Sequence, residues 1–295
     1  MTHGRSSPNV ERASVGPVDL AVARADPIMH RPQSGAQRRA GGRPCDFNQT
    51  RNKLFFADNE PVPTPPKAFI SWSSGKDSAF ALYEVRRAGL AEVVGALTTL
   101  NEAYDRVAMH GVRESVLDRQ LAALGLPALK VMLPNPCSNE AYEARLASAC
   151  AHMREQGVTH VVFGDLFLED IRAYRERQLA AVGITPIFPL WRRDTAELAR
   201  TMIASGLVAH LVCVDPRRLG REFAGRRFDE RLLAELPPQV DPCGENGEFH
   251  TVVSAGPMFS APFEVEVGTV VERDGFVFAD VTAATADQNR SVTVS

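Results

Sequence analysis

Cysteine is scarce in this sequence and is not spaced as a metal site or a disulfide scaffold requires. The chain has five cysteines, an odd number, and they are widely separated with no C-x-x-C pair among them. This spacing excludes a disulfide-stabilised scaffold, a zinc ribbon and a cysteine-ligated iron–sulfur cluster. Such cysteine usage is typical of a reducing compartment, and we expect a cytoplasmic protein.

Long hydrophobic runs and a strong excess of one charge are missing as well. The best apolar stretch, residues 207–214, contains His210 and is much shorter than the roughly 18 residues of a membrane span. The first 30 residues lack a continuous apolar core, which argues against a secretory signal. With a net charge of −3, the chain is not expected to bind an anionic membrane or to coat nucleic acid.

The first 66 residues differ from the rest in composition. They hold nine of the 20 prolines and carry nine Lys/Arg against six Asp/Glu, which leaves a charge of −6 on the remaining 229 residues. No apolar period is sustained in this segment, so it cannot bury enough surface to offset the entropy lost on ordering. We predict that residues 1–66 are a disordered N-terminal extension.

From residue 67 onward, segments typical of strands and of helices alternate. The predicted strands are residues 67–72, 92–100, 128–133, 158–163, 186–190 and 208–214. The predicted helices are residues 78–88, 112–124, 139–156, 170–181 and 194–205; a capping box of Asp194 and Glu197 opens the last one. Strands that are apolar throughout and alternate with helices predict an α/β fold, a doubly wound parallel sheet, over residues 67–218.

The alternation stops after Asp215, which indicates a smaller mixed C-terminal region at residues 219–282. Residues 221–236 are expected to form one or two short helices. Residues 265–271 and 276–281 flank Arg273-Asp274-Gly275 and predict a β-hairpin. Residues 283–295 are a polar tail.

One segment carries most of the chemical information: S-W-S-S-G-K-D-S at residues 71–78. It falls where the first strand ends and the first helix begins, and the amides at such a junction form an anion site. Hydroxyl donors, one lysine and one carboxylate there suit a nucleotide phosphate, with Asp77 as the ligand of Mg²⁺. The predicted phosphate-binding residues are Ser73, Ser74, Gly75, Lys76, Asp77 and Ser78.

Two common nucleotide-binding motifs are absent from this junction. Gly75-Lys76 is followed by Asp77 where a Walker A loop has Ser or Thr, and Ile70 stands at the position five before Gly75. No G-x-G-x-x-G follows the strand. A conventional P-loop NTPase and an NAD-binding Rossmann domain are therefore disfavoured.

The segment resembles the S-G-G-x-D-S loop of the PP-loop ATP pyrophosphatases, with Ser74 in place of the first glycine. Further segments are similar to the diphthine–ammonia ligase (diphthamide synthase) family and its bacterial relatives. These are M-H-G-V at residues 109–112, G-D-L at 164–166, W-R-R-D at 191–194 and C-G-E-N-G-E-F-H-T at 243–251. Asn246 replaces one glycine of the family's E-G-G-E-F-x-T signature. The resemblance extends from about residue 67 to residue 263 and implies a PP-loop fold related to the HUP and adenine nucleotide alpha hydrolase folds.

The resemblance also implies a reaction. A substrate carboxylate attacks the α-phosphate of ATP, pyrophosphate leaves, and ammonia converts the acyl-adenylate into an amide and AMP. Lys76, Asp77, Glu245 and Glu248 would be catalytic, and the loop, His110, Gly164 and Asp165 would hold ATP and Mg²⁺. Arg172, Gly247, Glu248, His250 and Thr251 would bind the acceptor, whose cationic group, as in diphthine, suits an acidic loop and aromatic faces such as Phe249 or Tyr174.

Each of these residues also has an ordinary structural explanation. His110 and Arg172 are compatible with a solvated helix surface, and Gly164-Asp165 with a strand end that caps the next helix. Glu245 and Glu248 could form an acidic turn, and Cys243 is at least as compatible with a packed thiol as with a nucleophile.

Two other functions stay open at the level of sequence. Other PP-loop proteins sulfurate tRNA, but the chain lacks paired cysteines and a basic RNA-binding face. A module that binds adenine nucleotides without turnover is the second alternative. The acceptor, the source of ammonia and the oligomeric state are not indicated by the sequence.

Overall fold

A computed structural model describes residues 64–103, 106–107 and 110–284. The predicted extension, up to residue 63, and the predicted polar tail, from residue 285, lie outside the described residues, as does Met109 of the M-H-G-V segment. Among the described residues, no helix combines the length and the apolar character that crossing a membrane requires.

The first of two sheets has six strands and is parallel except at one short strand. Its strands are β1 (Lys67–Ser71), β2 (Glu92–Asn101), β3 (Arg106–Val107), β4 (Ala128–Leu133), β5 (His160–Val162) and β6 (Thr185–Ile187). β1 lies between β2 and β5, and β6 continues the sheet beyond β5. β2 pairs with β4 and also with the short antiparallel β3. Because the chain leaves β1 in one direction for β2 and later returns on the other side for β5, the ends of β1 and β5 mark the topological switch point.

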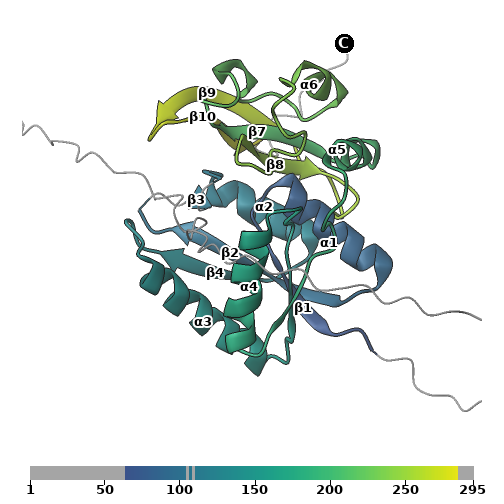
Figure 1. The fold of residues 1–295 in the computed structure, drawn as a ribbon, viewed down its shortest axis with the longest axis vertical. Coiled ribbons are helices and arrows are strands. Elements are labelled where there is room, and N and C mark those ends of the chain that lie inside the picture. The colour runs from purple at the N-terminus through teal and green to yellow at the C-terminus, as the bar shows by residue number, and fades with distance from the viewer. Residues whose placement is uncertain (1–63, 104–105, 108–109, 285–295) are drawn as a thin grey trace, which may run out of the picture.

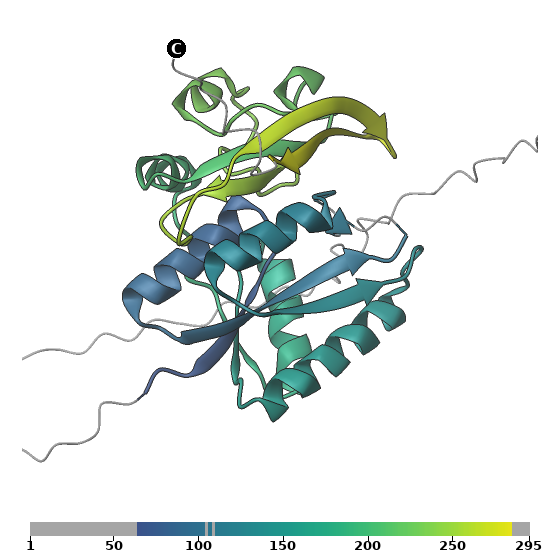
Figure 2. The same ribbon diagram turned by 180° about the vertical axis from the view of Figure 1, so that it is seen from behind.

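Helices cover both faces of this sheet (Figures 1 and 2). The helices are α1 (Lys76–Ala88), α2 (Glu114–Leu124), α3 (Asn139–Glu155) and α4 (Glu169–Ala181). α1 and α2 lie on one face, and α3 and α4 lie on the other. α1 buries Ala79, Leu82 and Val85 at helical spacing and ends at Gly89, whose φ of 63° closes the last turn. The predicted doubly wound α/β fold is confirmed.

A second, smaller sheet lies over the layer formed by α1 and α2 (Figure 1). It is antiparallel and its strand order is β8-β7-β10-β9. The elements of this part are α5 (Thr195–Ala204), β7 (Val208–Val214), η2 (Arg221–Phe223), α6 (Glu230–Glu235), β8 (Phe249–Ala255), β9 (Val265–Arg273) and β10 (Phe276–Ala283). The predicted hairpin is confirmed, and its turn places Asp274 and Gly275 at φ angles of 53° and 77°.

The predicted place of residues 208–214 in the parallel sheet is wrong. This segment is β7, which pairs antiparallel with β8 and β10 in the second sheet, so residues 67–218 contain strands of both sheets. β7 is an interior strand of its own sheet, between β8 and β10, and Ala209 and Leu211–Val214 are all buried. A central antiparallel strand covered on both faces has the same unbroken apolar sequence as a parallel strand, so periodicity could not separate the two.

The helices α1 and α2 of the first sheet pack directly against strands of the second sheet. α1 contacts β8, and α2 contacts β10. Arg113, just before α2, forms a bidentate ion pair with Asp280 of β10, with distances of 2.9 and 2.6 Å, and Arg106 donates to the same carboxylate at 3.1 Å. The C-terminal sheet is therefore held against the helix whose N-terminus carries the predicted phosphate loop.

Candidate active site

The loop between β1 and α1 is closed by hydrogen bonds among its own residues. The hydroxyl oxygens of Ser73 and Ser78 lie 3.2 Å apart, and the Ser78 hydroxyl donates to the Gly75 carbonyl at 3.0 Å. Gly75 is the N-cap of α1 and has no side chain with which to cap the helix. The first-turn amides therefore have no cap from within the loop, as an anion site at a helix N-terminus requires.

Ser74 occupies the position at which the resembling loops have glycine, and its backbone shows why. Its φ is 69°, in the left-handed region that glycine adopts without strain. Ser74 is fully buried, and its hydroxyl has no hydrogen-bond partner among the described residues. Its carbonyl accepts from the backbone amide of Val253 and from the Gln120 side chain, both at 3.0 Å. Contacts from outside the loop thus hold a conformation that a serine disfavours by about 1 kcal/mol.

Lys76 and Asp77 form an ion pair at the start of α1. The Lys76 ammonium nitrogen lies 2.8 Å from both carboxylate oxygens of Asp77 and donates to the Cys243 carbonyl. It also lies over the rings of Phe249 and Phe228, at 5.5 and 5.6 Å from their centroids. Burial is the largest single influence and disfavours the charge, but Asp77, together with Cys243 and Glu245, outweighs it and raises the pKa of Lys76, so the lysine stays protonated. Lys76 is 2% exposed and Asp77 29%, so the carboxylate is the member of the pair that solvent reaches.

The loop of residues 241–251, which we call the acidic loop, docks onto the phosphate loop. Thr251 accepts the Lys76 backbone amide on its hydroxyl at 3.1 Å and so caps α1 from the second sheet. Glu245 accepts the Leu166 amide at 2.7 Å, which fixes the segment after β5. Asp241 accepts the amides of Cys243 and Glu245 at 3.1 and 3.0 Å and shapes the turn between them.

The two predicted glutamates have different surroundings. Glu248 is 1% exposed; its Oε1 accepts from the Asp241 amide and the Asn246 side chain, both at 3.2 Å. Its position inside the loop indicates a structural contribution to the loop conformation. Glu245 is partly exposed, and burial together with the charges of Asp77 and Asp165 raises its pKa to about 8, against the opposing Leu166 hydrogen bond. A buried Cys243 thiol lies beside them, and desolvation raises its pKa, so a packed thiol fits better than a nucleophile.

The segment after β5 lies directly against the phosphate loop. A Cβ atom at Gly164 would approach the carbonyl carbon of Asp77 to 2.6 Å and the amide of Ser78 to 2.7 Å, so only glycine fits there. Asp165 is paired with Arg175 of α4 at 2.8 Å, and Arg175 stacks on Phe163 at 4.4 Å. Gly164 and Asp165 are thus brought to the phosphate loop, as predicted from their place at the same sheet edge.

The two predicted histidines lie together. The rings of His110 and His250 are tilted by 33° with centroids 4.5 Å apart, and a Cβ atom at Gly75 would lie 3.2 Å from the His110 ring and 3.3 Å from the Thr251 carbonyl. Burial, and then the charge of Lys76, lowers the pKa of His250 to about 4; burial also lowers the pKa of His110 well below its usual value. Both imidazoles are therefore neutral near pH 7, and the buried Nδ1 of His110 has no hydrogen-bond partner among the described residues.

Two further residues predicted to contact the acceptor lie in different surroundings, one at the surface and one in the interior. Arg172 stacks on Phe188 and Trp191, 4.9 and 4.7 Å from their centroids, and pairs with Glu176 at 2.7 Å on the surface of α4. Phe249 is 2% exposed and Lys76 lies over its ring, so its face is not open to a substrate cation.

A cavity of about 600 Å³ runs from the phosphate loop between the parallel sheet and the helices α3 and α4. The phosphate-loop end is formed by Ser71, Trp72, Ser73 and His110. The sheet contributes Leu97, Thr99 and Phe163, and the helices contribute Tyr142, Glu143, Tyr174 and Arg175. A mainly apolar cavity with a few polar groups at a strand-end loop is typical of a small-molecule site.

The carboxylates around the phosphate loop suit an Mg²⁺ ion that a nucleotide brings with it. Among residues 64–103, 106–107 and 110–284, no group of three His, Cys, Asp or Glu side chains is placed to hold a metal ion by itself. Burial raises the pKa of Asp77, and the nearby Asp241 and Asp165 add to this effect against Lys76, which makes an added cation favourable. Mg²⁺ commonly takes one or two carboxylates together with substrate phosphates, so these residues fit a nucleotide-bound ion better than a bare one.

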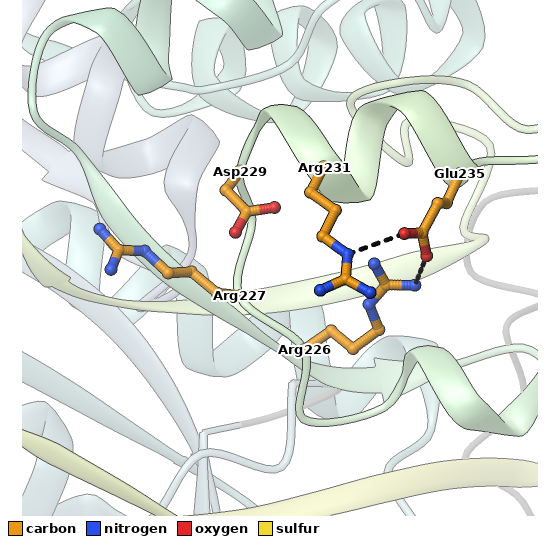
Figure 3. A pocket seen from close by; sticks show the side chains of 5 residues that line it. All are labelled: Arg226, Arg227, Asp229, Arg231 and Glu235. Carbon is orange, nitrogen blue, oxygen red and sulfur yellow. Dashed lines mark hydrogen bonds and ion pairs between the residues drawn. The ribbon is translucent and has the colours of Figure 1, made fainter.

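A second recess, on the C-terminal part of the molecule, shares no lining residue with the cavity at the phosphate loop (Figure 3). It has a volume of about 300 Å³ and is lined by Arg226, Arg227, Asp229, Arg231 and Glu235. Glu235 pairs with Arg226 at 2.7 Å and with Arg231 at 2.9 Å. The recess thus holds three arginines and two carboxylates, and two of the arginines share the carboxylate of Glu235.

Stability should depend on pH through Glu245. The pKa of Glu245 is about 8 in the folded protein against 4.5 normally. The stabilisation of the folded protein by the protonated carboxyl is therefore fully present below about pH 4.5 and is lost as pH rises through about 8. Glu245→Gln mimics the protonated form, so we expect its free energy of unfolding to change less with pH over this range. Above about pH 8 that free energy should exceed the value of the parent by on the order of 2–4 kcal/mol. Urea unfolding at several pH values, without nucleotide, measures this.

The control for loss of one negative charge is Glu155→Gln at an exposed position of α3. It should follow the pH curve of the parent. A Glu245→Gln curve parallel to that of the parent would contradict the raised pKa.

Comparison with known proteins identifies relatives of both halves of the chain. The family model described as "Diphthamide synthase N-terminal domain" matches residues 66–186, and "Diphthamide synthase C-terminal domain" matches residues 194–283. The boundary between the matches falls where the chain passes from the first sheet to the second. A diphthine–ammonia ligase of Danio rerio is 28% identical over 233 residues, 71% of this chain and 90% of the relative. The Homo sapiens protein of the same name is 24% identical over 232 residues, 71% of this chain and 86% of the relative.

Proposed function

We propose, on the premise that the chain belongs to the diphthamide synthase family and is an ATP-dependent carbon–nitrogen ligase, that it activates a carboxylate by adenylation for attack by ammonia. The relatives are named diphthine–ammonia ligases. The proposed acceptor is diphthine or another carboxylate, free or carried by a protein. The proposed products are an amide, AMP and pyrophosphate.

The phosphate loop is the feature that carries this proposal. It presents a helix N-terminus that has no cap from the loop itself, the hydroxyls of Ser73 and Ser78, and the partly exposed carboxylate of Asp77 at one strand end. We assign the β- and γ-phosphates of ATP to these groups. Asp77 is proposed to hold Mg²⁺, which when bound neutralises phosphate charge.

The cavity beside the loop suits the remainder of ATP. Its volume of about 600 Å³ lies within the range of small-molecule sites, and Ser71–Ser73 form one end of it. With pyrophosphate on the loop and adenosine in the cavity, the α-phosphate would lie at the junction, next to His110. The neutral His110 and His250 would donate hydrogen bonds to phosphate oxygens without adding charge.

The acidic loop is proposed to serve the second step. Ammonium must lose a proton before it attacks an acyl-adenylate, and a general base works best when its pKa is near the working pH. Glu245, with a pKa of about 8, is the proposed base. Glu248, buried in the same loop, would keep Glu245 and Thr251 in place. Asp165 would contribute to the ATP site, and Arg172 of α4 would bind the acceptor.

The experiment that tests this function follows the fate of ATP. With Mg²⁺, ammonium and candidate carboxylates, we expect AMP and pyrophosphate in equal amounts, and amide formation that requires ammonium. Chromatography and a coupled pyrophosphate assay measure these products. The Asp118→Asn variant, altered at an exposed site on α2, should retain the activity of the parent.

Two outcomes would contradict the proposal. ADP and phosphate as the major products would show that the bond between the β- and γ-phosphates is cleaved instead. ATP binding without carboxylate-dependent pyrophosphate release, across a broad panel of acceptors, would favour the nucleotide-binding module.

A further inference from the structure

Gln120 is a polar side chain in the interior of α2 that the proposed chemistry does not use. It is fully buried, with an exposed fraction of 0%. Its side-chain oxygen accepts from the Trp72 indole nitrogen at 3.0 Å. Its side-chain nitrogen donates to the carbonyl of Ser74 at 3.0 Å and to the carbonyl of Val253 at 2.7 Å. One amide therefore joins the phosphate loop to β8 of the second sheet.

We propose that Gln120 is a positioning residue that holds the backbone of the phosphate loop at Ser74 in its ATP-binding conformation and ties it to β8. The proposal rests on the assignment of ATP to this loop. Gln120 itself touches neither the phosphates nor the acceptor in that assignment.

The chemistry of the amide explains why glutamine is suited to this position. Its nitrogen has two hydrogens and both are used, while its oxygen accepts the indole hydrogen. Glutamate in its ionised form has no hydrogen to donate to the two carbonyls, and methionine has none at all. Without these hydrogens the Ser74 carbonyl keeps only the Val253 amide as a donor, so one of the two contacts that hold the backbone at Ser74 is lost.

The backbone at Ser74 is the point at which such support is needed. Its left-handed φ of 69° is not one that serine prefers, so local preference opposes the observed loop. The Ser74 carbonyl is held by two donors, the Val253 amide and Gln120, and Gln120 also bonds the Val253 carbonyl. β8 carries Thr251, which caps Lys76, so a displacement of β8 would reach the loop at two positions.

The first test compares two variants of α2. We expect Gln120→Met to remain folded and to bind ATP with Mg²⁺ at least about tenfold more weakly. A shift of the loop backbone would misplace several of the groups assigned to the phosphates at once. Leu117→Ala, which removes a fully buried apolar side chain of the same helix, lowers stability but should keep ATP affinity within about threefold of the parent. Calorimetric ATP titration gives the affinities, and circular dichroism shows that each variant is folded.

The second test uses the pH dependence of Gln120→Glu. A protonated glutamic acid accepts from Trp72 and donates one hydrogen bond to a carbonyl, whereas the ionised form donates none. Its deficit in ATP affinity relative to the parent should therefore be large at about pH 8 and shrink severalfold toward about pH 6, because burial raises the pKa of such a carboxyl. If this variant is unfolded at the higher pH, Gln120→Met decides.

The outcomes separate this proposal from the proposed function. If the parent binds ATP and both folded Gln120 variants bind it equally well, without a pH-dependent deficit, the positioning role is wrong. An equal loss of affinity in Leu117→Ala would also overturn it, because destabilisation of α2 would then be sufficient. If the parent itself does not bind ATP, the assignment of ATP to the loop fails first.

Discussion

Asp77→Asn is expected to slow ATP-dependent pyrophosphate release by about 10²–10³-fold, the usual effect of losing one preorganised electrostatic contact. The substitution keeps the size of the side chain, which is 29% exposed at the phosphate loop, but removes its negative charge. Mg²⁺ would then be held poorly, and the charge that moves onto pyrophosphate during adenylation would be less well neutralised. Initial rates over a range of Mg²⁺ concentrations measure the effect, and added Mg²⁺ should recover part of the loss.

The comparison variant is Glu245→Gln, on the acidic loop. We expect it to keep ATP affinity within about threefold of the parent while slowing amide formation, most strongly at low ammonium concentration. Asp77→Asn with full turnover, or Glu245→Gln with an equal loss of ATP affinity, would refute the division of the site between the two loops.

Lys76→Met is expected to lower the free energy of unfolding by about 3 kcal/mol. Removal of one partner from a buried ion pair typically costs about 3–5 kcal/mol. The lower end applies because Asp77 is partly exposed and can be hydrated after the lysine is lost. The Cys243 carbonyl would also lose a charged donor, which loosens the acidic loop from α1. Urea unfolding followed by circular dichroism measures the change.

Lys130→Met is the matched control. Lys130 pairs with Glu114 and Asp118 but is 30% exposed, and surface pairs of this kind contribute about 0–1 kcal/mol. A Lys76→Met variant as stable as Lys130→Met, with ATP binding lost, would show that Lys76 serves the phosphates directly rather than the contact between the two sheets.

The sequence predicted the site best where its residues are consecutive along the chain. The motif at residues 71–78 was placed correctly between β1 and α1, because a buried apolar strand, small residues and a helical period follow one another directly. Gly164-Asp165 was also brought to this loop as expected, since the carboxyl ends of parallel strands meet at one edge of a sheet.

The acidic loop could be recognised as a motif, but its contacts could not be predicted. Glu245 and Glu248 are three residues apart, yet one reaches the Leu166 amide while the other is buried under the loop. Which side of a glycine-containing turn each carboxylate occupies depends on backbone angles, such as the φ of 83° at Gly247, that spacing does not encode.

Local sequence alone thus determined the α/β class, the phosphate loop and most of the order of the elements, because strand and helix periods and turn residues act over a few positions; β3 and β8 were not predicted. The tertiary structure decided that β7 belongs to the second sheet, since the burial that makes it apolar comes from neighbours distant in the chain. It also decided that the Lys76 ammonium, paired with Asp77, lies over the rings of Phe228 and Phe249. Likewise, only the tertiary structure shows that Gln120 bonds Trp72, Ser74 and Val253. The Lys76 amide and the Thr251 hydroxyl are 175 positions apart in the chain, and only the packing of the two sheets brings them within hydrogen-bonding distance.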